Sequence, residues 1–140
     1  MLSKKCKYAL KTLVYLAKCK KGDVVKTVDI ANHENIPKKF LEQILISLKR
    51  AGYVASRQGN VGGYYLLTPA NKITIAEIYR LFEGAIALVP CVSLNFYQPC
   101  DDCDNEKKCE LKKFFIKLRD QNLKIMEKQT IESLVKMQDN

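Results

Sequence analysis

Hydrophobic residues recur at helical spacing through the first third of the chain. Between residues 4 and 19 they return every three or four positions, which predicts an amphipathic helix. A short second helix should start with Thr27 as its cap and run to about His33. Pro37 suits the first position of a third helix, and Gly52 suits its C-terminal end. The pattern therefore predicts three helices before any strand.

The third helix has one apolar face and one polar, mostly basic face. The apolar face follows an i, i+3, i+4, i+7 pattern that should pack into the core: Leu41, Ile44, Leu45 and Leu48. The opposite face and its margins hold Lys38, Lys39, Glu42, Gln43, Ile46, Ser47 and Arg50. A short helix, a tight connection and a second helix with an exposed basic face are typical of a helix-turn-helix that enters the major groove of DNA. Other pairs of amphipathic helices give a similar pattern, so the assignment as a DNA-binding motif depends on the segment that follows.

A hairpin pattern comes directly after the third helix. Residues 53–57 and 63–67 predict two short strands. The glycine and asparagine residues within 58–62 suit the positive φ angles of a tight turn. We interpret the hairpin as a wing, with Arg57 near its tip placed to reach phosphates or the minor groove. An edge hairpin that only covers the core is the alternative interpretation.

The second half of the chain predicts two further helices separated by an irregular segment. Thr74 and Glu77 form a capping-box pattern that opens a helix to about Phe82. From Glu110 to about Gln129 apolar residues recur at three- and four-residue steps, which predicts a long amphipathic helix. A helix of about 20 residues is roughly 30 Å long and extends beyond a small domain. A matching helix of a second subunit would cover its apolar stripe, whereas packing within its own subunit is the alternative.

The expected fold class is mainly α with a small β-hairpin wing, that is, a winged helix-turn-helix followed by a long C-terminal dimerisation helix. Residues 1–84 form the expected DNA-binding domain. Residues 85–109 form a cysteine-rich sensor loop, and residues 110–140 form the dimerisation helix with a C-terminal tail. One or two further helical turns are expected near the end of the chain, where residues 131–135 are mostly apolar.

The 140 residues carry a formal net charge of +9, which is unevenly distributed. Residues 1–70 hold 13 lysines and arginines against 4 acidic residues, whereas residues 71–140 hold 11 of each. A basic half beside a neutral half favours a polyanion-binding module, although a solvated lysine-rich surface gives the same count. The longest uncharged apolar stretch, residues 84–90, is far shorter than the roughly 20 residues of a membrane span. We therefore expect a cytoplasmic protein with no membrane partner.

Six cysteines are present, and four of them fall within 19 residues with the spacing C-x8-C-x2-C-x5-C. Cys6 and Cys19 lie in the first helical pattern, where a cysteine usually acts as a small buried hydrophobe. In a reducing compartment the clustered thiols favour metal binding or redox sensing over structural disulfides. An iron–sulfur cluster, a structural zinc ion and a thiol redox switch all fit this pattern. The four candidate ligands are Cys91, Cys100, Cys103 and Cys109.

Several motifs in order along nearly the whole chain resemble those of one known family. The most specific are the Phe-Leu-Glu-Gln motif at residues 40–43 and the Gly-Gly-Tyr motif at residues 62–64. The other matching segments are residues 7–10, 36–39, 44–45, 48–54, 57–59, 73–74, 83–84 and 109–111. The chain resembles the Rrf-type bacterial transcription regulators, a group that contains an iron–sulfur cluster regulator, a nitric-oxide sensor and a cysteine-metabolism repressor.

This resemblance implies a winged-helix domain, a long dimerisation helix and a palindromic operator. In many members it also implies an iron–sulfur cluster held by the loop before that helix. Glu42 and Gln43 match the family's base-reading pair by position, and Lys39 matches a neighbouring contact. Together with the basic face and the wing, we expect DNA contacts from Lys38, Lys39, Glu42, Gln43, Lys49, Arg50, Arg57 and Gln58.

The resemblance also bears on the ligand set. Cys103 and Cys109 match the family's second and third cysteines, and either Cys91 or Cys100 corresponds to the first. Where some members place a histidine as fourth ligand, this chain has Lys112, which cannot serve while it is protonated. We therefore expect all four thiolates to hold the cluster, with 2Fe–2S and 4Fe–4S both open.

The expected function is a sequence-specific DNA-binding transcriptional repressor. It should act as a homodimer on double-stranded DNA and be switched by an iron–sulfur cluster or by the redox state of the cysteine loop. The alternatives are a metal-free thiol switch, a small-molecule-responsive regulator, or a structural zinc site in the loop. An enzyme with a small-molecule substrate is not expected, because the chain has no phosphate-binding loop and its single histidine, His33, has no acid–base constellation near it.

Overall fold

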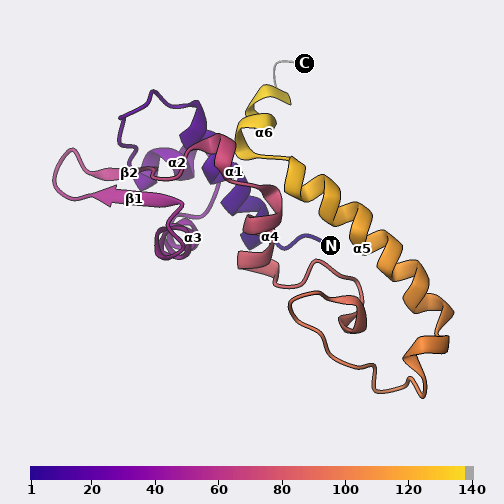
Figure 1. Cartoon of the computed structure of the whole chain (residues 1–140). Helices are drawn as coiled ribbons and strands as arrows, with labels where there is room; N and C mark the ends of the chain where they lie inside the picture. The colour runs from indigo at the N-terminus through magenta and orange to yellow at the C-terminus, as the bar shows by residue number, and fades with distance from the viewer. Residues whose placement is uncertain (138–140) are drawn as a thin grey trace.

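The computed structural model describes residues 1–137 and begins with three helices followed by a hairpin. The helices are α1 (Lys4–Lys18), α2 (Thr27–Glu34) and α3 (Lys38–Arg50). The hairpin consists of β1 (Val54–Arg57) and β2 (Gly63–Leu66), and it projects from one end of the molecule (Figure 1). This order of elements is the winged helix-turn-helix that the sequence predicts.

The core forms around α1 and the apolar face of α3. Leu41, Ile44, Leu45 and Leu48 are all fully buried, which confirms the predicted core face of α3. They pack with apolar residues of the neighbouring helices, among them Leu13, Leu16 and Ile30. Burying a leucine or isoleucine side chain contributes about 1.5–3 kcal/mol, so this cluster fixes the rotation of α3 about its axis. Its polar face is thereby held toward solvent.

Two helix starts differ by one residue from the sequence expectation. Lys26, not Thr27, precedes the first residue of α2, and no side chain caps this end. Pro37 lies just before α3, which begins at Lys38. Sequence alone misplaces such ends because the cap is defined by backbone angles rather than by residue type. The capping box of Thr74 with Glu77 and the positive φ of Gly52 are as expected.

The hairpin is anchored to the segment before α2. The antiparallel register pairs Val54 with Leu66 and Arg57 with Gly63. Val25 and Tyr64 exchange two backbone hydrogen bonds of 2.8 Å, so residues from the turn after α1 extend the small sheet. A Cβ on Gly63 would lie 2.3 Å from the carbonyl oxygen of Val25, which explains why this position lacks a side chain. The wing is therefore joined to the helix-turn-helix on both sides.

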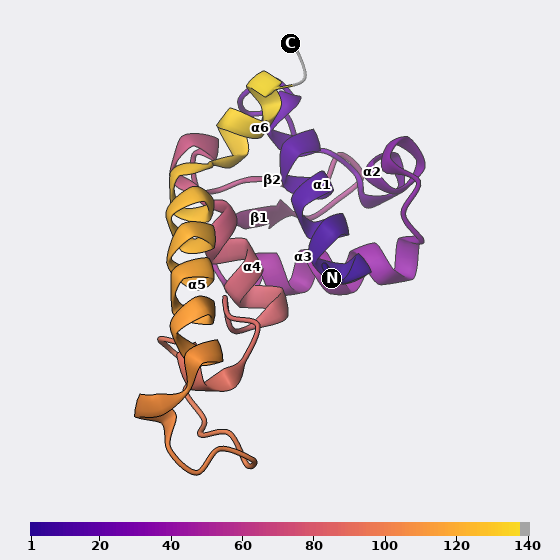
Figure 2. The same cartoon turned by 90° about the vertical axis from the view of Figure 1, so that its right-hand side faces the viewer.

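The second half of the molecule extends away from the winged helix (Figure 2). After the 3-10 turn η1 (Ala70–Lys72) come α4 (Ile75–Glu83), an irregular segment, and the long helix α5 (Glu110–Lys128). The helix α6 (Ile131–Met137) returns to pack on α1, and it buries Ile131 in the core. Two single-turn helices interrupt the irregular segment: η2 (Pro90–Val92) and η3 (Glu106–Lys108).

The helix α5 contributes no buried residue within its own chain. Leu111, Phe114 and Ile125 are 68%, 59% and 60% exposed, respectively. Packing against α4 and η2 covers only part of its apolar surface. Across residues 1–137, no helix combines the length and the apolar character required to cross a membrane.

Candidate DNA-binding face and cysteine cavity

The polar face of α3 is presented to solvent as the sequence predicts. Glu42 and Gln43 are adjacent and exposed, on the side of the helix opposite its buried leucines. A glutamate accepts from the amino group of cytosine, and a glutamine forms two hydrogen bonds with one edge of adenine, accepting from N6 and donating to N7. Lys38, Lys39 and Arg50 are also exposed and flank this pair along the helix. The face thus combines two side chains that are chemically able to bond base edges with flanking cations.

Lys49 is exposed like its neighbours but is engaged with the hairpin. Its Nζ donates a hydrogen bond of 2.6 Å to Oγ of Ser56 in β1. Thr68, just past β2, donates a hydrogen bond of 2.8 Å to the carbonyl oxygen of Gly52. These two contacts join both strands of the wing to the C-terminal end of α3. Sequence reasoning did not predict them because they link positions 7 and 16 residues apart.

The tip of the wing carries Arg57 and Gln58, which are both exposed. Beside them Val61 is 80% exposed, an apolar side chain at the outermost turn of the hairpin. Proteins that bind the minor groove of DNA frequently insert apolar side chains between base steps. Val61 is a candidate contact that the charge pattern alone did not reveal.

The four clustered cysteines lie around one cavity of about 290 Å³ between the irregular segment and the start of α5. Cys91 comes from η2, Cys100 and Cys103 from the loop, and Cys109 from the residue that caps α5. The backbone N–H of Lys112 donates a hydrogen bond of 3.4 Å to Sγ of Cys109. The positive end of the α5 dipole therefore faces this sulfur.

Within the cavity the thiols form two neighbouring pairs. A thiol–thiol hydrogen bond with Cys91, together with burial, raises the pKa of Cys100 to about 11. Burial also raises the pKa of Cys103, and the adjacent Cys109 thiol adds to this rise. All four side chains are free thiols in this structure. The sequence predicted the cluster of four but not the way in which it divides.

The arrangement of these thiols bears on which metal centre they fit. A single tetrahedral zinc ion with Zn–S bonds of about 2.3 Å brings all four sulfurs to about 3.8 Å from one another. In the described residues no three histidine, cysteine, aspartate or glutamate side chains are arranged to hold one metal ion. Two neighbouring pairs of thiols can also ligate a dinuclear centre, in which each iron takes two thiolates. Four thiols around one cavity are thus a donor set that both iron–sulfur clusters and zinc accept.

An ionic network closes one side of the cavity. Nζ of Lys112 donates to Glu106, and the Tyr97 hydroxyl donates a hydrogen bond of 2.7 Å to the same carboxylate. These two contacts hold the pKa of Glu106 below its usual value, so the carboxylate is charged at neutral pH. Lys112, which stands where the resemblance implies a histidine ligand in some members, is thereby paired with a neighbouring acid. This contact links the start of α5 to η3.

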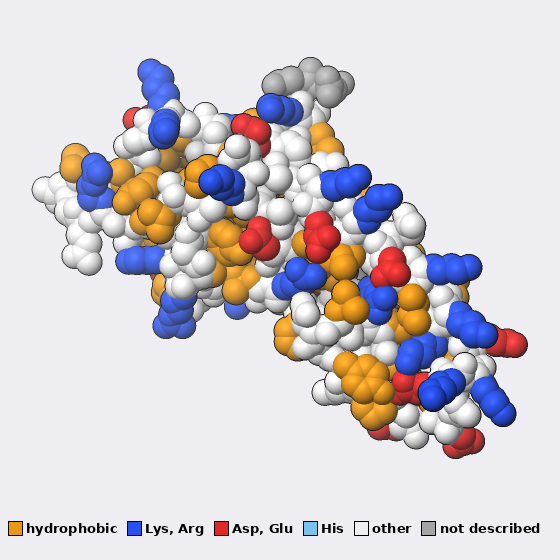
Figure 3. Space-filling model, viewed as in Figure 1, with side chains coloured by type: hydrophobic (Ala, Val, Ile, Leu, Met, Phe, Trp, Pro, Cys, Tyr) orange, Lys and Arg blue, Asp and Glu red, His pale blue; other side chains and the backbone are white. Residues whose placement is uncertain are grey.

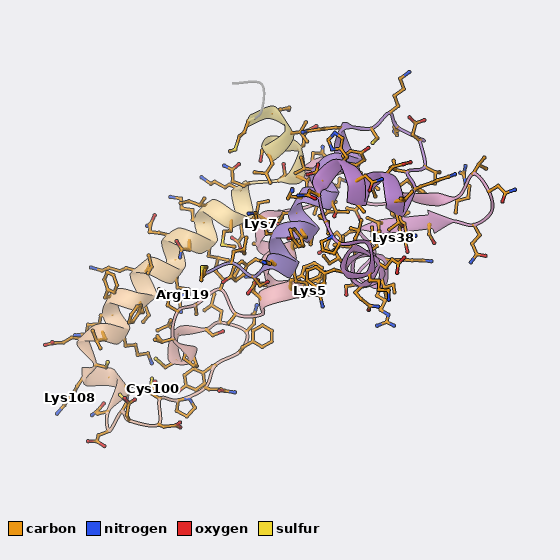
Figure 4. All side chains as sticks on the ribbon, turned by 180° about the vertical axis from the view of Figure 1, so that it is seen from behind. Lys5, Lys7, Lys38, Cys100, Lys108 and Arg119 are labelled. Atoms are coloured by element: carbon orange, nitrogen blue, oxygen red, sulfur yellow. The ribbon has the colours of Figure 1, made fainter. Side chains whose placement is uncertain are left out.

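The cysteine cavity and the DNA-binding face lie at opposite ends of the molecule, as the positions of Cys100 and Lys38 show (Figure 4). They are connected by packed helices: η2 contacts α5, α5 contacts α4, α4 contacts α1, and α1 contacts α3. Near the cavity, Nη1 of Arg119 donates to the carbonyl oxygen of Val92 at 2.6 Å. A continuous series of packed elements therefore links the cysteine loop to α3.

A winged helix that exposes a partly basic face of α3 defines a DNA-binding transcription regulator, and this one also has a separate cavity lined by four cysteines. Residues 2–137 match the Rrf2 family, described as iron-dependent transcriptional regulators. The chain belongs to this family. Its members and relatives are transcription regulators rather than enzymes.

Individual relatives agree with this assignment. An rrf2-like HTH-type transcriptional regulator of Rhodobacter capsulatus is 40% identical over 138 residues, which is 96% of this chain and 92% of the relative. The structure of CymR, the global cysteine regulator of Bacillus subtilis, superposes with a TM-score of 0.79 at 30% identity and covers 98% of this chain and 97% of CymR. An oxidized form of Staphylococcus aureus CymR gives a TM-score of 0.74 at 27% identity, with 96% and 95% of the two chains covered. These likenesses confirm the winged-helix fold class.

Proposed function

We propose that the chain is a repressor that binds a palindromic operator as a homodimer, under control of the cysteine cavity. The observation that carries the proposal is the exposed α3 face, where Glu42 and Gln43 lie between basic residues beside a fixed wing. Each of the three segments then has its own role. Residues 1–84 bind DNA, residues 85–109 respond to the redox or cofactor signal, and residues 110–140 form the dimer interface.

On DNA, Glu42 accepts from a cytosine amino group and Gln43 pairs with an adenine edge in the major groove. The surrounding cations neutralise phosphates and supply most of the affinity. These are Lys38, Lys39, Lys49, Arg50 and Arg57. Gln58 and Val61 extend the wing contact toward the minor groove.

The exposed apolar residues of α5 support the homodimer. Leu111, Phe114 and Ile125 form a set of large apolar side chains that a monomer would leave in water. A two-fold partner covers them with its own α5, because the same surface meets itself in such an interface. Two recognition helices then lie about 34 Å apart, one helical turn of DNA, which accounts for a palindromic site.

For the cofactor we propose a [2Fe–2S] cluster held by Cys91 with Cys100 on one iron and by Cys103 with Cys109 on the other. The pairing of thiols around one cavity supports this choice, because a [4Fe–4S] cluster takes one thiolate on each iron. When bound, such a cluster supplies a one-electron redox centre. The four cysteine ligands of the cluster would link η2, the loop and the start of α5 to one another.

A metal-free thiol switch is the second candidate, and the same pairs favour it. Adjacent thiols form a disulfide when hydrogen peroxide accepts two electrons: two S–H bonds are lost, one S–S bond forms, and the hydrogen peroxide is reduced to two molecules of water. The expected bonds are Cys91–Cys100 and Cys103–Cys109. The likeness to an oxidized form of S. aureus CymR is consistent with redox control in this fold.

The experiment that tests the DNA-binding function is a selection from random duplex DNA with the full chain. We expect an enriched palindrome whose half-sites are one helical turn apart, protected by one dimer. Light scattering of the free protein measures the dimer independently. Failure to enrich any sequence, with a monomer in solution, would overturn the proposed operator binding.

A further inference from the structure

A second cavity, remote from the cysteine loop, lies between the C-terminal end of α1 and the end of β2. It has a volume of about 330 Å³, at the lower end of the roughly 300–1,000 Å³ typical of small-molecule sites. Its walls are mainly apolar and come from both elements, with Leu16 and Ala17 on α1 and Tyr65, Leu66 and Leu67 on the other side. Neither the DNA-binding face nor the thiol pairs account for it.

The rim of this cavity carries a net positive charge. Lys20, Lys21 and Asp23 are its charged lining residues, and all three are exposed. Within residues 1–137 neither of these lysines forms an ion pair. Figure 3 shows hydrophobic side chains bordered by lysine and arginine at the wing end of the molecule. Apolar walls beneath two free ammonium groups suit a molecule with an apolar body and an anionic head.

The thiol of Cys19 also lines this cavity. It donates a hydrogen bond of 3.4 Å to the carbonyl oxygen of Tyr15, and burial raises its pKa. A protonated thiol already bonded to backbone behaves as a neutral, weakly polar wall. Cys19 therefore favours the apolar body of a ligand over a charged head.

The position of the cavity couples it to the wing. Residues 19–23 form one wall, and two residues later Val25 pairs with Tyr64 through two backbone hydrogen bonds. Tyr64 immediately precedes the β2 residues of the opposite wall. A molecule held between these walls would therefore contact both the turn and the strand that this bridge joins.

We propose that this cavity is an effector site for a small anionic amphiphile, such as a medium-chain carboxylate, and that its occupancy alters DNA affinity through the Val25–Tyr64 bridge. The binding step stands on the cavity alone. The coupling step rests on the proposed DNA-binding function, because a ligand shifts DNA affinity only if it prefers one position of the wing.

The binding step is tested with octanoate, octylammonium and octan-1-ol, added to the isotopically labelled full chain below their aggregation limits and followed by amide NMR. We expect saturable shifts confined to residues 16–23 and 65–70, with octanoate bound at least about threefold more tightly than octylammonium, as for an exposed ion pair. The double variant Lys20→Ala/Lys21→Ala should lose this preference but keep its affinity for octan-1-ol. The control Lys124→Ala/Lys128→Ala removes the same charge from α5 and should keep it.

Two results would overturn the site: equal binding of octylammonium, or shifts centred on the exposed apolar residues of α5. The coupling step is measured as the affinity for the selected duplex with and without octanoate, and we expect a change of at least about fivefold. If octanoate binds in the cavity and this affinity stays constant, the effector role is wrong. If the protein binds no DNA at all, the proposed function fails while the NMR experiment still decides the site.

Discussion

Arg119, midway along α5, donates a hydrogen bond of 2.6 Å from Nη1 to the carbonyl oxygen of Val92, the residue after Cys91. Its Nε and Nη2 atoms both donate to Asp120, so the guanidinium is held in one orientation. The side chain is only 15% exposed, which strengthens the contact relative to one in open water. Arg119 thus fastens the first thiol pair to the helix that we assign to dimerisation.

Replacing Arg119 with alanine should weaken the link between the loop and the rest of the molecule. In the wild type, we expect the operator affinities of reduced and peroxide-treated protein to differ by a certain ratio. In Arg119→Ala this ratio should be smaller by about fivefold or more, because the loop is no longer coupled to α5. Anisotropy titration of a labelled duplex measures both states. Lys117→Ala, at an exposed position of the same helix, should respond like the wild type. An unchanged ratio in Arg119→Ala would remove this residue from the route.

Gln43→Ala should relax sequence preference at one base pair of each half-site and weaken specific binding by about 1–3 kcal/mol. The reason is that a bidentate contact to adenine is lost while the phosphate contacts stay. Repeating the selection with the variant reveals the position that it reads. Gln121→Ala, an exposed amide on α5, serves as the control. If Gln43→Ala selects the wild-type operator with equal stringency, the base-reading role is wrong.

Binding should weaken steeply with salt, because the cations around α3 and the wing displace counterions from the duplex. Arg57→Ala should lower the slope of log affinity against log salt by about 0.9, the contribution of one neutralised phosphate. Val61→Ala removes apolar contact at the same tip and should reduce affinity without altering that slope. A slope that is identical for Arg57→Ala and the wild type would place Arg57 away from the backbone of DNA.

Gly63→Ala should loosen the wing. The added Cβ would lie 2.3 Å from the carbonyl oxygen of Val25, so the strand must move away and both hydrogen bonds of the Val25–Tyr64 bridge are strained. We expect a loss of about 1–3 kcal/mol in the free energy of unfolding, measured with urea, and weaker DNA binding. Gly59→Ala meets no neighbouring atom and carries only the strain of a positive φ, so its loss should be smaller. Equal losses for the two variants would contradict the role of the bridge.

Much of this molecule was predictable from local sequence patterns. The i, i+3, i+4 spacing placed Leu41, Ile44, Leu45 and Leu48 in the core, and the same spacing exposed Glu42 and Gln43 on the opposite face. The capping box likewise placed the start of α4 correctly. These features depend on neighbours within one or two turns, which the sequence displays directly.

The features that join distant segments were not predictable in this way. The cysteine spacing predicts a shared site but contains no sign that Cys91 lies beside Cys100 rather than beside Cys103. The contact of Arg119 with Val92 spans 27 positions, and the Val25–Tyr64 bridge spans a helix-turn-helix. Such contacts follow from how the elements pack, so a pattern along one segment cannot show them.

The central claim is that the chemical state of the cysteine cavity sets the affinity for DNA. The most direct test is an anisotropy titration of the selected duplex with anaerobically purified protein before and after treatment with peroxide, in the wild type and in the double variant Cys91→Ala/Cys103→Ala, which lacks one thiol of each pair. The account predicts that peroxide changes the affinity of the wild type by at least about tenfold and leaves that of the double variant nearly unchanged. Wild-type protein that binds the duplex equally well before and after peroxide would contradict it.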